Sequence, residues 1–290
     1  MLDQSSPACA DICVSYQPMR DLRRLTDALM PIAARAGAAI MDIYNGAFTV
    51  ERKDDNSPLT LADLESQRII VESLRQLTPD VPVLSEESAQ APWRVRQTWR
   101  ELWVVDPLDG TREFVKRNGE FTVNIALVVE HEPVLGVVTA PAQGIAYWGA
   151  TGIGAFRQDA DGSVHPLHVA APVSPLRVVG SRSHMSPETA AYLAGFPPHE
   201  MTGVGSSLKF CLLAEGKAEL YPRFGPTSEW DTAAGQALLE AAGGHVTRMD
   251  GHRLRYNCRE SLINGDFVAF THPSVLSRTQ SPSPRAPPPP

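Results

Sequence analysis

The stretch LWVVDPLDGT, residues 102–111, decides how we interpret the fold of the whole chain. Its first four residues are apolar and are followed directly by Asp106-Pro107. A short apolar run that stops at a polar residue and a proline predicts a buried strand ending at a loop. We therefore expect the Asp106 carboxylate at the end of a strand. Asp109 lies three residues further on and can face the same point.

The last residues of this stretch are suited to binding an anion. Gly110 lets the backbone come close to a ligand, because glycine has no side chain to obstruct it. The N–H groups of Gly110 and Thr111, at the start of a helical turn, could hold a phosphate group. Asp, Pro and Gly are also common in turns without any function. The motif alone therefore leaves the simpler interpretation of a turn open.

Two further acidic segments lie beside predicted apolar elements. Glu86-Glu87 follows a short apolar run, and Asp231 precedes a segment rich in alanine and leucine. Glu86-Glu87 could simply be a solvated loop, and Asp231 could simply be a helix N-cap. A hard cation such as Mg²⁺ nevertheless requires oxygen ligands, and these are often supplied by separate segments. The small residues Ala233, Ala234 and Gly235 would let the helix approach such a site closely.

Asp63 is the fourth acidic position of interest. It lies three residues after Thr60, so the two residues could form a capping box at a helix start. Asp63 could instead be a base that orients an attacking water molecule. Thr111 would then accept a hydrogen bond from the water and donate one to Asp63. The residues themselves leave both interpretations open.

The patterns around these motifs predict a layered α/β fold in which strand ends deliver polar residues to a shared cleft. Three successive strands with short connections, within residues 121–149, predict an antiparallel meander. The expected helices cover residues 19–44, 60–77, 207–215 and 232–242, and the expected strands cover residues 82–84, 102–105, 121–129, 134–140, 145–149, 176–180 and 218–221.

Composition excludes some classes of function. The 290 residues include 33 acidic and 26 basic ones, and the net charge of −7 argues against nucleic-acid binding. We expect free thiols and a reducing, cytoplasmic setting, without a signal peptide or a transmembrane segment. Peripheral attachment to a membrane stays open. Residues 1–18 are expected to be flexible, and the Pro-rich tail 279–290 is expected to be disordered.

Four motifs occur together and in order: KxxNSPLTxAD at 53–63, SEE at 85–87, DPLDGT at 106–111 and WDTAAG at 230–235. Together they resemble the lithium-sensitive, inositol monophosphatase-like family, over nearly all of residues 20–270. The resemblance implies an αβαβα sandwich. It also implies one phosphatase domain over residues 19–278, made of two α/β halves at about 19–170 and 171–278.

Within this family the sequence is similar to the bacterial 3′(2′),5′-bisphosphate nucleotidases. The residues that carry this similarity are VPVLSEES at 81–88, residues 106–127, SRSH at 181–184 and residues 205–235. The similarity implies two or three Mg²⁺ ions as cofactor. It implies 3′-phosphoadenosine 5′-phosphate as the substrate, hydrolysed to AMP and phosphate by water that the metal activates. The sulfated relative of that nucleotide is a further possible substrate.

The resemblance also implies roles for individual residues. Asp63 and Thr111, together with Glu86, resemble the group that activates the water. The implied magnesium ligands are Glu86, Asp106, the Leu108 carbonyl, Asp109 and Asp231. The implied substrate contacts are Gly110, Thr111, Ser206, Lys209, Arg223 and Asp231.

Some of these contacts have alternatives. Lys209 could equally be a solvated helix lysine whose stem covers apolar surface. Arg223 follows an apolar run and is well placed for a bidentate phosphate contact. His184 could lie beside the base of a nucleotide or belong to a surface loop.

Two other functions compete with a nucleotidase. The first is an inositol or sugar phosphate phosphatase, which would share the metal motifs. The second is a non-catalytic sensor of a phosphonucleotide, although a sensor would not need to retain Asp63 and Thr111. The sequence does not determine the oligomeric state or the number of ions.

Overall fold

The computed structural model describes residues 20–47, 49–52, 58–181 and 186–277. Both terminal segments, Cys9, Cys13, His184 and the first residues of the KxxNSPLTxAD motif lie outside this range. The helices are α1 Leu22–Asn45, α2 Leu61–Leu77, α3 Trp93–Arg96, α4 Thr111–Val115, the 3₁₀ helix η1 Pro141–Gln143, α5 Pro187–Leu193, α6 Leu208–Ala214, α7 Glu229–Ala241 and α8 Pro273–Leu276. The strands are β1 Val50–Arg52, β2 Pro58–Thr60, β3 Val83–Ser85, β4 Glu101–Asp109, β5 Thr122–Val129, β6 Glu132–Ala140, β7 Ile145–Ala150, β8 Gly154–Gln158, β9 Val164–Leu167, β10 Leu176–Ser181, β11 His199–Val204, β12 Leu220–Arg223, β13 His245–Arg248 and β14 Phe267–Phe270.

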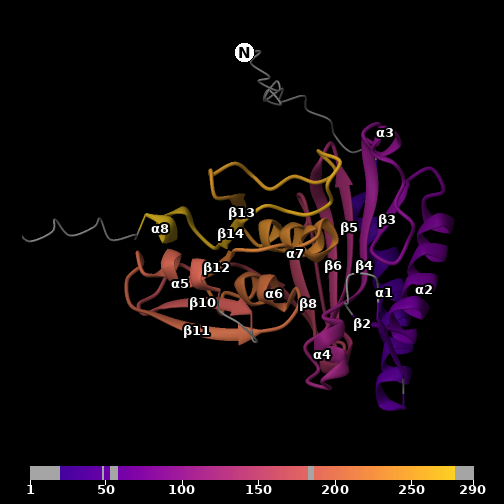
Figure 1. Cartoon of the computed structure of the whole chain (residues 1–290), viewed down its shortest axis with the longest axis horizontal. Helices are drawn as coiled ribbons and strands as arrows, with labels where there is room; N and C mark the ends of the chain where they lie inside the picture. Colours follow the sequence, from indigo (N-terminus) through magenta and orange to yellow (C-terminus); the bar gives the residue numbers. More distant parts are fainter. Residues whose placement is uncertain (1–19, 48, 53–57, 182–185, 278–290) are drawn as a thin grey trace, which may run out of the picture.

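A seven-stranded sheet forms the centre of the first half of the chain. Its strands follow the order β3-β4-β5-β6-β7-β8-β9, and every neighbouring pair after β3-β4 is antiparallel. The meander expected within residues 121–149 is confirmed as β5-β6-β7. Helices α1 and α2 lie together on one face of this sheet and bury their apolar residues against it (Figure 1).

A five-stranded sheet with the order β11-β10-β12-β14-β13 forms the second half. Helices α6 and α7 lie between the two sheets, as Figure 1 shows, and share one apolar core with both of them. A smaller core under α5 and α8 covers the outer face of the second sheet. The layers therefore follow the order helix, sheet, helix, sheet, helix, which confirms the αβαβα sandwich.

Strand alternation places Asp106 on the α7 side of the first sheet. Successive side chains of a strand point to opposite faces. Leu102 and Val104 belong to the core shared with α7, whereas Trp103 and Val105 belong to the core under α1 and α2. Asp106 is the next residue in this alternation and is itself buried.

The prediction that strand 102–105 ends before Asp106 is wrong. Strand β4 continues to Asp109, because Asp106 pairs with Asn124 and, after a bulge, Asp109 pairs with Thr122. A proline cannot donate to a strand ladder but is tolerated at a bulge, where Pro107 lies. The bulge keeps the acidic residues inside the sheet instead of in a free loop.

Helix α7 packs unusually close to the first sheet. A methyl group added at Gly136 of β6 would lie 2.3 Å from the Ala234 carbonyl oxygen. The absence of a side chain at Gly136 thus lets this helix lie close to the sheet at Ala234. The contact fixes the distance between α7 and the strands that carry the acidic residues.

We predict that Gly136→Ala destabilises the protein, because the new methyl group must push α7 away from the sheet. Overpacking of this kind costs about 1–3 kcal/mol. Thermal unfolding measures the loss. Gly265→Ala is the matched control, since a methyl group there would meet nothing within 4 Å. Equal melting temperatures for the two variants would contradict the close packing.

Candidate metal centre and substrate pocket

Three carboxylates from separate elements converge at one point. One oxygen atom each of Glu86, Asp106 and Asp231 lies within 4.8 Å of the other two. Glu86 directly follows β3, Asp106 lies in β4, and Asp231 lies in the first turn of α7. Carboxylates at this spacing repel one another when ionised.

The surroundings make ionisation of this cluster unfavourable without a cation. Burial raises the pKa of Asp106 well above its ordinary value, and the charges of Glu86, Asp109 and Asp231 add to the effect. Burial also raises the pKa of Asp231 to about 8, with a further contribution from Asp109. A bound divalent cation would reverse this penalty. The donor set consists of carboxylate oxygens, so it fits a hard cation such as Mg²⁺ or Ca²⁺.

Asp109 lies beside this cluster and is oriented by hydrogen bonds. Its Oδ2 atom accepts from the Ser207 hydroxyl at 2.8 Å and from Asn124 Nδ2 at 3.3 Å. The Leu108 N–H donates to Asp106 Oδ1 at 3.0 Å, which fixes the bulge between the two aspartates. Sequence reasoning missed Ser207 and Asn124, although both lie inside blocks that carry the family resemblance.

Asp63 forms the expected capping box and also contacts Thr111. Its Oδ2 atom accepts from the backbone N–H and the hydroxyl of Thr60, both at 2.7 Å, and so completes a capping box. Its Oδ1 atom accepts from the Thr111 hydroxyl at 3.2 Å. Asp63 is buried. Its capping contacts hold one carboxylate oxygen in place, and the other oxygen contacts the Thr111 hydroxyl.

The position of Asp231 before the alanine-rich segment suggested that it could be the N-cap of the helix. The structure shows that it is not. Ser228 is the N-cap, and Asp231 is the third residue of α7. Its Oδ2 atom accepts from the Ser228 N–H at 2.8 Å. The helix starts earlier than expected because Ser228 and Asp231 form a capping box. Asp231 therefore reaches the cluster from inside the first turn.

A pocket of about 160 Å³ opens next to the acidic residues. Five of the expected substrate contacts line it, and these are Gly110, Ser206, Lys209, Arg223 and Asp231. The pocket therefore carries acidic groups and basic groups in one enclosure. Its other lining residues are Asp109, Glu113, Ser181, Gly205, Phe210, Tyr221, Thr227 and Thr232.

Lys209 is buried, so the interpretation as a solvated helix lysine is wrong. Its Nζ atom donates to the Ser206 carbonyl at 2.6 Å and lies 5.6 Å from the centre of the Tyr221 ring. Burial lowers its pKa, while Asp109 opposes this effect. The interior accepts the ammonium group because carbonyl oxygens and an aromatic face surround it.

Arg223 lines the pocket from the end of β12. Its Nη2 atom donates to the Pro226 carbonyl at 3.1 Å. Its buried Nε atom has no partner among the described residues. The guanidinium group therefore keeps hydrogen-bonding capacity for an anionic ligand.

Ser206 joins the two loops that face each other across the pocket. Its hydroxyl lies within hydrogen-bond distance of the carbonyl oxygens of Asp109, at 2.9 Å, and Glu120, at 2.7 Å. A methyl group at Gly110 would lie 2.1 Å from this hydroxyl, and Gly110 has a φ of +89°. Only glycine satisfies both conditions at this turn.

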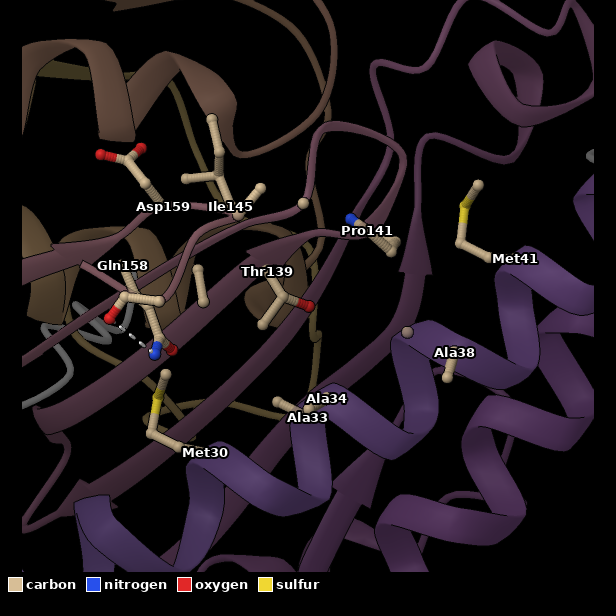
Figure 2. A pocket seen from close by; sticks show the side chains of 15 residues that line it. Met30, Ala33, Ala34, Ala38, Met41, Thr139, Pro141, Ile145, Gln158 and Asp159 are labelled. Atoms are coloured by element: carbon tan, nitrogen blue, oxygen red, sulfur yellow. Dashed lines mark hydrogen bonds between the residues drawn. The ribbon is translucent and has the colours of Figure 1, made fainter. Parts of the chain in front are cut away.

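A larger pocket of about 390 Å³ lies elsewhere, between α1 and the η1 and β8 region. Figure 2 shows that Met30, Ala33 and Ala34 line it from the helix, facing Thr139, Ile145 and Gln158. None of the expected site residues lines it. The candidate site therefore follows from the chemistry of the side chains and not from pocket size.

The fold and the acidic centre define a family of phosphatases. The model of the inositol monophosphatase family matches residues 21–279, so the chain belongs to this family. A 3′(2′),5′-bisphosphate nucleotidase CysQ from Salmonella typhimurium is 53% identical over 238 residues, which are 81% of this chain and 95% of that protein. The CysQ of Escherichia coli strain K12 is 51% identical over 245 residues, which are 84% of this chain and 98% of that protein.

A solved structure supports the same assignment. The crystal structure of CysQ from Bacteroides thetaiotaomicron, a bacterial member of the family, has a TM-score of 0.76 and 40% identity. It covers 87% of this chain and 99% of its own. The resemblance to bisphosphate nucleotidases that the motifs indicated is thereby confirmed. Among the described residues, no helix is both long enough and apolar enough to span a membrane.

We predict that Asp231→Asn stabilises the metal-free protein, and more so as the pH rises. An ionised Asp231 opposes folding because its pKa rises from 3.8 to about 8 on burial. The free-energy cost of an ionised Asp231 in the folded protein is absent below pH 3.8 and grows until the pH passes about 8. Asparagine does not titrate and can still accept from the Ser228 N–H. We expect a gain of about 1–3 kcal/mol at pH 8 and a smaller one at pH 5.

Thermal unfolding in the presence of a chelator, at pH 5 and pH 8, measures this difference. Asp250→Asn is the control, since hydrogen bonding to His252 and the charge of Arg248 lower the pKa of this exposed residue. That variant should show no gain at either pH. The idea fails if Asp231→Asn and the native protein lose stability in parallel as the pH rises.

Proposed function

We propose that the protein is a magnesium-dependent 3′(2′),5′-bisphosphate nucleotidase that hydrolyses 3′-phosphoadenosine 5′-phosphate to AMP and phosphate. One observation carries the proposal. A single pocket joins the acidic residues Asp109 and Asp231 to the basic residues Lys209 and Arg223. A substrate with two separate phosphate groups matches this arrangement, one group at the metal centre and one at the basic residues. The nucleotidase relatives support the same substrate class.

The acidic cluster would hold two or three Mg²⁺ ions through Glu86, Asp106, the Leu108 carbonyl, Asp109 and Asp231. When bound, such ions make water a stronger acid and neutralise charge on the phosphoryl oxygens. The N–H groups of Gly110 and Thr111, at the start of α4, would bind the phosphate to be removed.

Asp63 and Thr111 would receive the proton of the attacking water. The Thr111 hydroxyl lies 3.2 Å from Asp63 Oδ1 and 3.3 Å from the Leu108 carbonyl oxygen; when it donates to Asp63, its own oxygen can accept a hydrogen bond from water. Asp63 Oδ2 is occupied by the capping contacts with Thr60, which leaves Oδ1 facing Thr111. The capping box therefore orients the proposed base.

Lys209 and Arg223 would bind the second phosphate. Both line the pocket, and Arg223 retains an unpartnered Nε atom within the described residues. Charge-assisted hydrogen bonds of this kind are stronger than neutral ones. An inositol or sugar monophosphatase has no need for this second basic site. A non-catalytic sensor has no need for the Asp63 and Thr111 pair, so neither alternative is favoured.

The same similarity leads us to propose a setting for the reaction. The enzyme would recycle the nucleotide by-product of sulfur assimilation in the cytoplasm, and lithium ions would inhibit it by competing for the metal site. Asp109 and Asp231 line the pocket with carboxyl groups that offer no hydrogen bond to a phosphate when ionised. We therefore expect weak binding of substrate when no divalent cation is bound.

We predict that phosphate release from 3′-phosphoadenosine 5′-phosphate requires Mg²⁺ and is faster than release from inositol 1-phosphate. Asp106→Asn should abolish release, because the buried centre of the acidic cluster loses its charge. Asp250→Asn, at an exposed turn, should retain full activity. Faster release from inositol 1-phosphate would overturn the assignment of the substrate. No phosphate release from either compound would favour the non-catalytic sensor.

We predict that Asp63→Asn and Thr111→Val each lower kcat by about 10²–10⁴-fold, the usual contribution of general acid–base catalysis. The Mg²⁺ concentration needed for half-maximal stabilisation against heat should change little, because neither side chain belongs to the acidic cluster. Initial rates at saturating substrate test the first point. A normal kcat in both variants would exclude the proposed proton acceptor.

A further inference from the structure

Glu113 is an acidic residue of the pocket that the proposed chemistry does not use. It lies in the first turn of α4, three residues after Gly110, and lines the same pocket as Lys209 and Arg223. It is outside the cluster of Glu86, Asp106 and Asp231. Within the described part of the chain, its carboxylate makes no hydrogen bond or ion pair, although its charge acts on nearby Lys209.

The neighbouring loop determines where this side chain can lie. A methyl group at Gly205 would be 3.0 Å from Glu113 Cγ and 2.7 Å from the Glu120 carbonyl oxygen. The Gly205 N–H in turn donates to Glu120 Oε2 at 3.0 Å. The side chain of Glu113 therefore packs against the backbone of this loop, and its carboxylate lies at the pocket wall.

An unpaired carboxylate is unfavourable in a pocket that receives phosphate groups. Like charges repel, so Glu113 would weaken binding unless the ligand offers it a hydrogen-bond donor. An ionised carboxylate only accepts, and its two oxygens have about four lone-pair sites. A ligand hydroxyl or amine that faces Glu113 would supply such a donor.

The position of Glu113 favours a hydroxyl of the sugar. Under the proposed function, the phosphate to be removed lies at the N–H groups of Gly110 and Thr111, one helical turn from Glu113. The donor nearest to that phosphate in a ribonucleotide is the hydroxyl on the adjacent ring carbon. A 3′-phosphate leaves a 2′-hydroxyl there, and a 2′-phosphate leaves a 3′-hydroxyl.

We propose that Glu113 accepts a hydrogen bond from the sugar hydroxyl adjacent to the phosphoester that is cleaved, and thereby selects ribonucleotides over 2′-deoxyribonucleotides. This inference rests on the proposed nucleotidase function. Both the 3′ and the 2′ isomers place a free hydroxyl beside the phosphate, so the same carboxylate can serve both. Hydrogen bonds to charged groups change affinity by roughly 10–100-fold.

The test compares 3′-phosphoadenosine 5′-phosphate with its 2′-deoxy analogue. We expect the native protein to prefer the ribonucleotide by roughly 10–100-fold in kcat/KM. In Glu113→Ala this preference should fall to within about threefold, and in Glu113→Gln, whose amide oxygen can still accept, it should fall to roughly 3–10-fold. The reason is that the ribonucleotide loses its charged partner, whereas the deoxy analogue never had one. Glu188→Gln is the matched control, because Glu188 also lies in the first turn of a helix but does not line the pocket.

The outcomes separate this inference from the function on which it rests. If the Glu113 variants lose kcat/KM equally for the ribonucleotide and the 2′-deoxy analogue, Glu113 only stabilises the helix and the inference is overturned. An unchanged preference, or a native protein without preference, would also overturn it. A third comparison uses the analogue in which a 6-oxo group replaces the 6-amino group of adenine. If the Glu113 variants change kcat/KM for this base analogue relative to the adenine nucleotide, and not the preference for the ribose, Glu113 faces the base and the inference is overturned. A native protein that hydrolyses neither nucleotide with Mg²⁺ would overturn the nucleotidase function together with this inference, and thermal unfolding verifies that each variant is folded.

Discussion

The mutual repulsion of three closely spaced carboxylates, one of them buried and two half-buried, is the constraint on which the rest of the structure depends. Glu86, Asp106 and Asp231 have oxygen atoms within 4.8 Å of one another, and Asp106 is almost completely buried. Such an arrangement opposes folding in the absence of a cation. It persists because each carboxylate is held by an element whose own stability comes from elsewhere. Strand β4 lies inside the first sheet, and α7 is enclosed between the two sheets.

The start of α7 is held by a polar network that lies mostly outside the pocket and meets it at Thr232. Both oxygens of Glu229 accept from the Asn257 N–H, at 2.9 Å and 2.8 Å, and Arg96 donates to Asn257 Oδ1 at 2.7 Å. Asn264 Nδ2 donates to the Ser228 carbonyl at 2.9 Å and to the Thr232 hydroxyl at 2.9 Å. These contacts surround the turn that carries Asp231. Segments far apart in the sequence thus fix the turn that carries Asp231, one of the proposed metal ligands.

The sequence was informative where a local pattern determines the outcome. The apolar run before Asp106 predicted a buried strand, and the spacing from Thr60 to Asp63 suggested a capping box as one of two interpretations; both the strand and the capping box are present. Long-range packing set the features that were missed. Strand β4 passes through Pro107 because β5 continues to pair with it beyond the bulge. Lys209 is buried because the Tyr221 ring of β12 packs over its ammonium group, which also donates to the Ser206 carbonyl three residues earlier. The short strands β8, β9 and β11 are only partly buried, so they carry no clear apolar pattern.

The same pocket must attract phosphate and yet be lined by carboxylates, and its arrangement resolves this conflict. Asp109 and Asp231 line one part of the pocket and would need a cation beside them before a phosphate could bind there, whereas Lys209 and Arg223 offer cationic groups without a metal. A ligand with a single phosphate could therefore settle at the basic residues, away from the reacting centre. A ligand with two phosphates can satisfy both ends at once, and binding at the basic end then holds the other phosphate against the cations. The second phosphate thus contributes to positioning as well as to affinity, since orientation of the reacting groups is itself a large part of catalysis.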